Sequence, residues 1–166
     1  MNKFVNRKVE KTTNESQPQK QGKWNIDLDL SRDKLDFTKL AEKCMWDYMP
    51  KRKDEKKRPK SCDYGDLTVT QMRNMWGRVT AIYNQVRLQP SADNLSGEIQ
   101  QQLRAFKIRL VYESARTPDV GEFCQTSSVL SALDQIGEDK DKFFRYVRYF
   151  EALVAYHYYY TKNRKD

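Results

Sequence analysis

The stretch that most constrains the fold runs from Phe143 to Tyr160, near the end of the 166-residue chain. Its apolar residues recur every three or four positions, which is the spacing of one face of an α-helix. That face consists of Phe143, Val147, Phe150, Val154 and Tyr158. Further Tyr and Leu residues widen it until mainly Arg145, Arg148 and two alanines remain on the opposite side. A helix this apolar predicts the central helix of a small bundle, with neighbouring helices and then protein partners or a ligand covering it.

The pattern before this stretch predicts four more helices. They are expected at about 32–49, from 68 to just before Pro90, at about 95–116 and at about 120–135. Ser31 is expected to cap the first and Thr68 or Asp66 the second. Gly137 is expected to close the fourth with a left-handed residue. After residue 60 no hairpin signal predicts a strand, so we expect an all-α fold, a compact five-helix bundle with an N-terminal extension.

Charge and composition divide the chain into three parts. Residues 1–23 carry six Lys or Arg against two Glu, or +4, and are too polar to form a core, so they predict a disordered basic arm. Residues 24–60 predict an extension with a short alternating stretch from Trp24 to Leu30, one helix and a linker. That linker, 51–60, carries seven cations against two acids, or +5. It indicates either a solvated connection or a contact with RNA or DNA phosphates. Residues 61–166 predict the helical bundle domain, which is close to neutral at 14 cations against 13 acids, or +1.

Catalytic and metal-binding residues are not grouped in the sequence. Three cysteines without a CxxC pair, at positions 44, 62 and 124, favour neither disulfides nor zinc. The only histidine, His157, lies within the aromatic helix and is expected to be a packing residue. The six glycines are scattered and form no phosphate loop. We expect no enzyme, no metal and no cofactor. No apolar run is long enough to span a membrane and the N-terminus lacks a signal-peptide centre, so a cytoplasmic location is expected.

A few cations of the bundle have a suggestive spacing. Arg109, Tyr112 and Arg116 share one stripe of the 95–116 helix, and Lys107 flanks its apolar face on the other side. On the preceding helix, Arg73 and Arg78 lie on opposite flanks. Guanidinium groups on a rigid helix can bind phosphates, and a tyrosine between them can stack on a base. The alternative is that these are ordinary solvated side chains.

Three stretches resemble one protein family, the small subunit of the type III-A CRISPR effector, the Csm complex. Leu67-Thr-Val-Thr-Gln-Met-Arg73 is similar to the family's first block, which opens with a Thr/Ser-Gln-x-Arg pattern. The segment Leu103 to Arg116 resembles the next block, with its Lys-x-x-Leu-x-Tyr and closing Ala-Arg. Phe150-Glu-Ala-Leu-Val-Ala-Tyr-His157 resembles the most distinctive block, near the C-terminus. The likeness spans about residues 66 to 160, and the extension before it departs from the compact family pattern.

The resemblance implies a non-catalytic subunit with a five-helix body. Several copies would stack head to tail inside a ribonucleoprotein and line the channel that holds guide RNA paired to target RNA, beside the large subunit and the repeated backbone subunits. Because the guide sequence varies, such a subunit is expected to contact the RNA backbone. Carried over by position, the RNA-facing residues are Arg73, Lys107 and Arg116, and helix geometry adds Arg78 and Arg109.

Two alternatives stay open at this point. The first is the related small subunit of the type III-B effector, which has the same function but another order of blocks. The second is a helical protein–protein adaptor that docks through its Tyr-rich last helix without RNA. RNA binding that weakens with salt would favour the two RNA-binding hypotheses over the adaptor hypothesis.

Overall fold

The computed structural model describes residues 26–32, 34–48, 67–89 and 93–162. These residues form six helices: α1 Phe37–Tyr48, α2 Val69–Leu88, α3 Gly97–Arg116, α4 Pro118–Thr126, α5 Val129–Ile136 and α6 Lys140–Lys162. Within these ranges the only β-type pairing is an isolated bridge between Asn94 and Asp139. The prediction of an all-α fold is confirmed. The arm at 1–23, the linker at 51–60, Trp24, Cys62, Pro50 and Pro90 lie outside the described residues.

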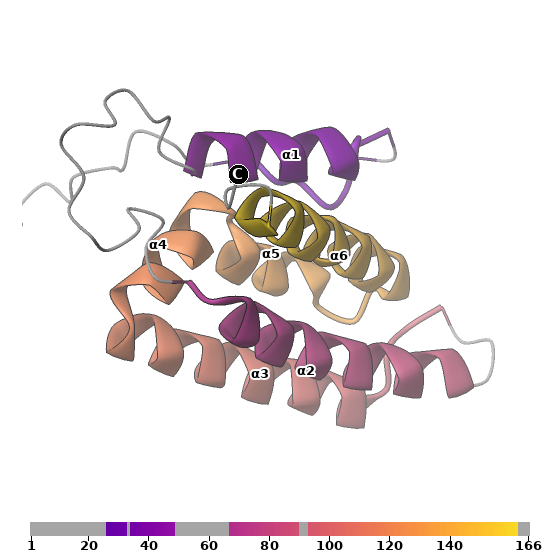
Figure 1. Cartoon of the computed structure of the whole chain (residues 1–166). Coiled ribbons are helices and arrows are strands. Elements are labelled where there is room, and N and C mark those ends of the chain that lie inside the picture. Colours follow the sequence, from indigo (N-terminus) through magenta and orange to yellow (C-terminus); the bar gives the residue numbers. More distant parts are fainter. Residues whose placement is uncertain (1–25, 33, 49–66, 90–92, 163–166) are drawn as a thin grey trace, which may run out of the picture.

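Helix α6 is the centre of the packing, as its sequence predicts. It contacts α1 on one side and α2 and α5 on the others (Figure 1). Phe150 is fully buried and meets the Trp76 ring of α2, with the ring centroids 6.2 Å apart, and the Phe123 ring of α4 at 6.4 Å. Nearer the start of the same helix, the Phe144 ring meets the Tyr83 ring of α2 edge to face, with the ring centroids 5.8 Å apart. Aromatic rings from three helices therefore hold the core together.

The start of α2 is fixed by the residues around Thr68. The Gln71 backbone N–H donates to the Thr68 hydroxyl at 3.2 Å, and the Thr68 N–H donates to the Gln71 side-chain oxygen at 2.8 Å. This reciprocal pair is a capping box, which satisfies two N–H groups that a helix start leaves without partners. Of the two caps considered from the sequence, the structure selects Thr68.

The prediction of one helix at about 120–135 is wrong, because this stretch forms two helices, α4 and α5. At the break, the Ser127 N–H and hydroxyl both donate to the Phe123 carbonyl, at 2.9 and 2.6 Å, which ends α4. Ser128 then adopts a left-handed conformation with φ of 58°. Serine hydroxyls compete with the helical ladder in this way. The turn lets α4 pack on α3 and α5 pack on α6, and it makes six helices in place of the expected five. Gly137 follows the last residue of α5 as predicted and has a positive φ of 54°, but its ψ of −119° lies outside the left-handed helical region that was expected.

The helix predicted from about residue 32 begins later, at Phe37. Ser31 does not cap it, because the Ser31 N–H and hydroxyl donate to the Asp29 carboxylate at 3.0 and 2.6 Å and form a turn there. These hydrogen bonds lower the pKa of Asp29. The Asp36 carboxylate instead accepts from the Lys39 backbone N–H at 3.1 Å, as a cap does.

The segment before α1 lies against the rest of the body and contains turns, because the Leu28 N–H donates to the Ile26 carbonyl at 3.0 Å and the Arg32 N–H to the Asp29 carbonyl at 3.4 Å. The Gln135 side chain of α5 accepts from the Leu30 N–H at 2.8 Å and donates to the Leu28 carbonyl at 2.7 Å. Leu28 and Leu30 are buried, and so are Ala41, Cys44 and Met45 of α1. Residues 28–45 therefore contribute to the same hydrophobic core as the later helices.

Candidate nucleic-acid interface

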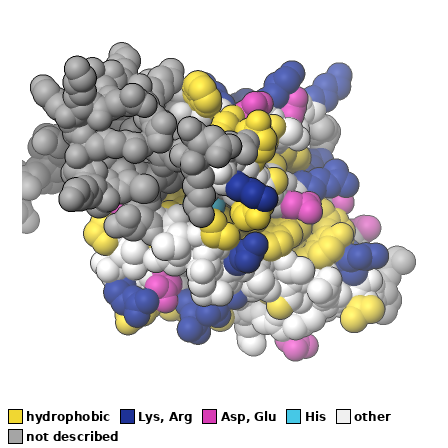
Figure 2. Space-filling view, in the orientation of Figure 1, with side chains coloured by type: hydrophobic (Ala, Val, Ile, Leu, Met, Phe, Trp, Pro, Cys, Tyr) yellow, Lys and Arg dark blue, Asp and Glu magenta, His cyan; other side chains and the backbone are white. Residues whose placement is uncertain are grey.

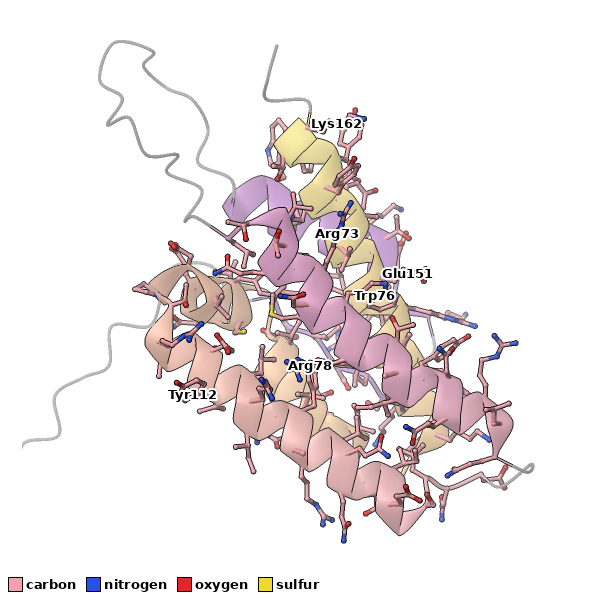
Figure 3. The ribbon with its side chains drawn as sticks, turned by 60° about the horizontal axis from the view of Figure 1, so that its bottom comes forward. Arg73, Trp76, Arg78, Tyr112, Glu151 and Lys162 are labelled. Carbon is pink, nitrogen blue, oxygen red and sulfur yellow. The ribbon has the colours of Figure 1, made fainter. Side chains whose placement is uncertain are left out.

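Helices α2 and α3 run antiparallel and meet along an outer seam (Figure 1). The Gln102 side-chain amide of α3 donates to the Gln85 side-chain oxygen of α2 at 2.7 Å, which fixes the register across this seam. A step of seven residues returns to nearly the same face of a helix. Seven residues back from Gln85 is Arg78, and seven residues on from Gln102 is Arg109. The two arginines therefore occupy the same level of the seam, and Figure 3 shows Arg78 on the side of α2 toward α3.

The Arg78 and Arg109 side chains are exposed. Within the described parts of the chain, no carboxylate forms an ion pair with either of them. Two guanidinium groups at one level raise the positive potential between them, because neither is paired with a carboxylate of the described residues. An anion that contacts both would be bound by planar groups suited to phosphate oxygens.

Arg116 extends the seam by a further seven residues from Arg109. Its guanidinium forms an ion pair with Glu113 at 3.3 Å, within the same helix, and lies 6.0 Å from the centre of the Tyr112 ring. Tyr112 is 60% exposed. Arg116 can exchange this exposed ion pair for a phosphate at little cost, because exposed pairs contribute at most about 1 kcal/mol.

The remaining two predicted residues lie elsewhere. Arg73 is on the opposite flank of α2, where its guanidinium lies 5.7 Å from the centre of the Tyr158 ring of α6. Lys107 lies on the far flank of α3 and donates to the Asp134 carboxylate of α5. The five residues thus fall into three places: Arg78, Arg109 and Arg116 at the seam, Arg73 beside α6, and Lys107 in an ion pair between α3 and α5.

Sequence reasoning missed two residues that lie beside Arg73. The Tyr158 ring is 43% exposed, and the Lys162 ammonium group lies 5.9 Å from its centre. The spacing of four between Tyr158 and Lys162 is a sequence signal for this contact. This spacing did not identify the contact because Tyr158 also fits the apolar face of the helix and was assigned to the core. Figure 2 shows apolar side chains reaching the surface in a band between α6 and α2, with Lys and Arg side chains beside it.

The groups most capable of chemistry are used in packing. His157 is 1% exposed, and its Nε2–H donates to the Leu67 carbonyl at 2.9 Å, which confirms the prediction of a packing residue. Burial lowers the pKa of His157 and raises that of the Cys124 thiol to about 11. Among the described residues, no three His, Cys, Asp or Glu side chains are close enough to hold a metal ion. None of the described helices combines the length and hydropathy needed to cross a membrane.

Six helices around one core, with Arg78, Arg109 and Arg116 along the seam of two neighbouring helices, define a small all-α protein with a local cluster of arginines on its surface. Comparison with known proteins then gives the family. The family model described as Csm2 Type III-A matches residues 51–163, and the chain belongs to this family.

Individual relatives agree with the family match. The chain is 31% identical over 98 residues to the CRISPR system Cms protein Csm2 of Mycobacterium tuberculosis (strain CDC 1551 / Oshkosh). The aligned residues cover 59% of this chain and 78% of the relative. The chain is 31% identical over 106 residues to the protein of the same name from Enterococcus italicus, covering 63% and 75%. With the Streptococcus thermophilus protein it shares 28% over 94 residues, covering 57% and 73%. The chain is therefore a small subunit of a type III CRISPR effector, the multi-subunit Csm complex.

Proposed function

We propose that this chain is a non-catalytic subunit that stacks in several copies inside the type III-A ribonucleoprotein and binds the backbone of guide RNA paired to target RNA. The contact would be independent of sequence and would serve antiviral defence in the cytoplasm. The other partners would be the large subunit and the repeated backbone subunits. The observation that carries the proposal is the arginine pair across the α2–α3 seam, Arg78 and Arg109, which lack a carboxylate partner among the described residues.

Chemistry favours phosphate as the ligand of this seam. Guanidinium groups bind phosphate oxygens bidentately, whereas base-edge reading would need side chains that enter a groove. A-form duplexes are bound mainly through backbone and shape, because their major groove is too narrow for side chains. Each copy offers only a few cations, so the affinity of one copy is expected to be modest. Several copies on one RNA multiply that affinity.

Contact between copies is supported by apolar side chains on the outer side of α3. Ile108 is 71% exposed, and Val111 and Tyr112 are exposed beside it. Their burial against a neighbouring subunit would remove apolar area from water, at about 25 cal/mol per Å². We propose this stripe as one of the surfaces that a further copy covers.

The test is the salt dependence of RNA binding by the full chain, measured by fluorescence anisotropy with a labelled RNA duplex. The double variant Arg78→Ala/Arg109→Ala is compared with Arg104→Ala, a matched control whose exposed side chain lies on the other side of α3. Loss of two phosphate contacts lowers the slope of log K against log salt by roughly 1.4 to 1.8, and the control leaves it nearly unchanged. Equal slopes for the two variants would overturn the seam as the RNA site.

The adaptor alternative has one observation in its favour, the exposure of Tyr158 and Tyr159 on the last helix. It predicts partner proteins that stay bound after nuclease treatment and at high salt, with no RNA affinity in the isolated chain. Co-purification of short repeat-spacer RNAs together with the large and backbone subunits would instead support the ribonucleoprotein.

A further inference from the structure

A groove of about 250 Å³ lies between the start of α2 and the end of α6. Its lining consists of Val69, Met72, Arg73, Val154, Ala155 and Tyr158. Five of these six side chains are apolar or aromatic, so the floor of the groove offers no hydrogen bonds to a polar ligand. The volume is below the roughly 300 to 1,000 Å³ of pockets for drug-sized ligands, and it suits a single small ring system.

Two cations stand at one end of this groove. The Arg73 guanidinium and the Lys162 ammonium group lie 5.7 and 5.9 Å from the centre of the Tyr158 ring, which is within the range of cation–π attraction (Figure 3). In the described part of the chain, neither cation forms an ion pair with a carboxylate. Glu151 lies on the same face of α6, one turn before Ala155, at the end of the groove away from Lys162 (Figure 3). The groove is thus apolar in the middle and positive at one end.

The two cations at one end of the groove favour a ligand that carries negative charge. The basic segments of the chain itself, 1–23 and 51–60, would bring further positive charge to Arg73 and Lys162. An apolar protein segment would fill the groove but leave both cations uncompensated. A ligand that joins a flat, weakly polar ring to an anion fits both parts, and a nucleotide has that composition.

We infer that the groove takes one unpaired nucleobase of RNA, with the adjoining phosphate between Arg73 and Lys162. The base lies beside the Tyr158 ring, where stacking is indifferent to base identity because every base has a π-face. The inference rests on the proposed function and adds to it a second kind of contact, since the seam binds only phosphates. Unpaired nucleotides at a bulge, a loop or a strand end are the ones whose bases are free to enter.

The groove and the seam lie on opposite flanks of α2. Arg73 belongs to the groove and Arg78 to the seam, and five residues separate them, or about 7.5 Å along the helix axis. An RNA strand that uses both sites therefore crosses α2 within about one and a half turns. This arrangement predicts that the base in the groove lies at the end of a paired stretch, or is displaced from it.

The test compares two RNA duplexes of one sequence, one fully paired and one with a single-nucleotide bulge, bound to the full chain. Ala155→Leu fills the groove without changing charge, and residue 155 is exposed on a helix that tolerates leucine. Ala115→Leu is the matched control, an exposed alanine of α3 that lies neither at the groove nor on the side of α3 that carries Gln102 and Arg109. We expect the wild-type chain to bind the bulged duplex about tenfold more tightly, and Ala155→Leu to remove that preference while leaving the paired duplex unaffected.

Each outcome separates this inference from the proposed function. If wild type binds both duplexes equally and salt-sensitively, the base site is overturned and the phosphate seam stands. If it binds neither duplex, the proposed function fails and the base site with it. If Ala155→Leu lowers the melting temperature and leaves the preference for the bulge unchanged, the groove is covered by protein and the inference is overturned.

Discussion

The imidazole Nε2–H of His157 on α6 donates to the carbonyl oxygen of Leu67, 90 positions earlier in the chain, at 2.9 Å. Leu67 directly precedes Thr68, the cap of α2. One hydrogen bond therefore joins the start of α2 to the central helix, beside the groove that Arg73 and Tyr158 line. Because the imidazole is buried, its charged form is disfavoured and its pKa is lowered from the ordinary value of 6.5.

This burial predicts a pH dependence of stability. Below pH 6.5 the unfolded chain protonates its histidine and the folded chain resists, so the unfolding free energy falls as the pH is lowered, by at most about 1.4 kcal/mol per pH unit. His157 is the only histidine, and ordinary carboxyl groups titrate below about pH 5. Urea unfolding between pH 7.5 and 5.5 should show this decline in wild type and a flat profile in His157→Gln, which keeps an N–H donor. A decline of equal slope in both proteins would contradict the prediction.

Two glycines give opposite predictions for the same substitution. A Cβ at Gly121 of α4 would lie 2.9 Å from the Ser114 carbonyl oxygen of α3, so Gly121→Ala must push two helices apart. We expect a loss of about 1 to 3 kcal/mol in unfolding free energy. A Cβ at Gly77, inside α2, meets no atom within 4 Å, and Gly77→Ala should add about 0.5 to 1 kcal/mol through helix propensity. Urea denaturation measures both, and a stabilising Gly121→Ala would show that α3 and α4 are not in such close contact.

The helices were predictable where apolar spacing decides them, and the breaks were not. The aromatic stretch from Phe143 identifies α6 because its core positions recur over about four turns, from Phe143 to His157. The division between α4 and α5 depends on Ser127 and Ser128, whose hydroxyls reach the carbonyls of Phe123 and Ile26. The second of these contacts spans 102 positions, and no local pattern contains it. Tertiary hydrogen bonds therefore set the boundaries that periodicity leaves open.

Gln135 provides a third prediction, because its side chain pairs with two backbone groups of the segment before α1. Gln135→Ala leaves the Leu28 carbonyl and the Leu30 N–H without these partners. We expect a loss of about 1 to 3 kcal/mol in unfolding free energy. Hydrogen exchange should also quicken at the Leu30 amide, since its acceptor is gone. Gln101→Ala, at an exposed position of α3, is the matched control and should change neither quantity. An unchanged exchange rate at Leu30 would show that another group protects it.

The five cations named from the sequence illustrate what helix geometry alone can resolve. Helical periodicity correctly placed Arg73 and Arg78 on different sides of α2, and Lys107 and Arg109 on different sides of α3. The side of a helix on which a residue lies depends only on its position within that helix. Periodicity could not show that Arg78 and Arg109 share a level, since this depends on the register that Gln85 and Gln102 fix. Nor could it supply Asp134 as the partner of Lys107, 27 positions away. Pairing across helices is the information that the sequence pattern lacks.

That difference in pairing predicts different effects for Lys107 and Arg116. The carboxylate partner of Lys107 comes from another helix, α5, whereas Arg116 pairs with Glu113 one turn away on its own helix. Arg116→Ala should therefore weaken RNA binding and lower the salt slope by roughly 0.7 to 0.9, with helix content unchanged. Arg73→Ala should lower the slope in the same way for a bulged duplex, because Arg73 lies at the groove and not at the seam. Lys107→Ala should alter the slope less, because the ion pair with Asp134 of α5 holds Lys107 on the far flank of α3, away from the seam. Anisotropy titrations at several salt concentrations, with circular dichroism as the check on folding, measure both effects. A larger slope change for Lys107→Ala than for Arg116→Ala would mean that RNA displaces Asp134 and contacts the α3–α5 side of the molecule.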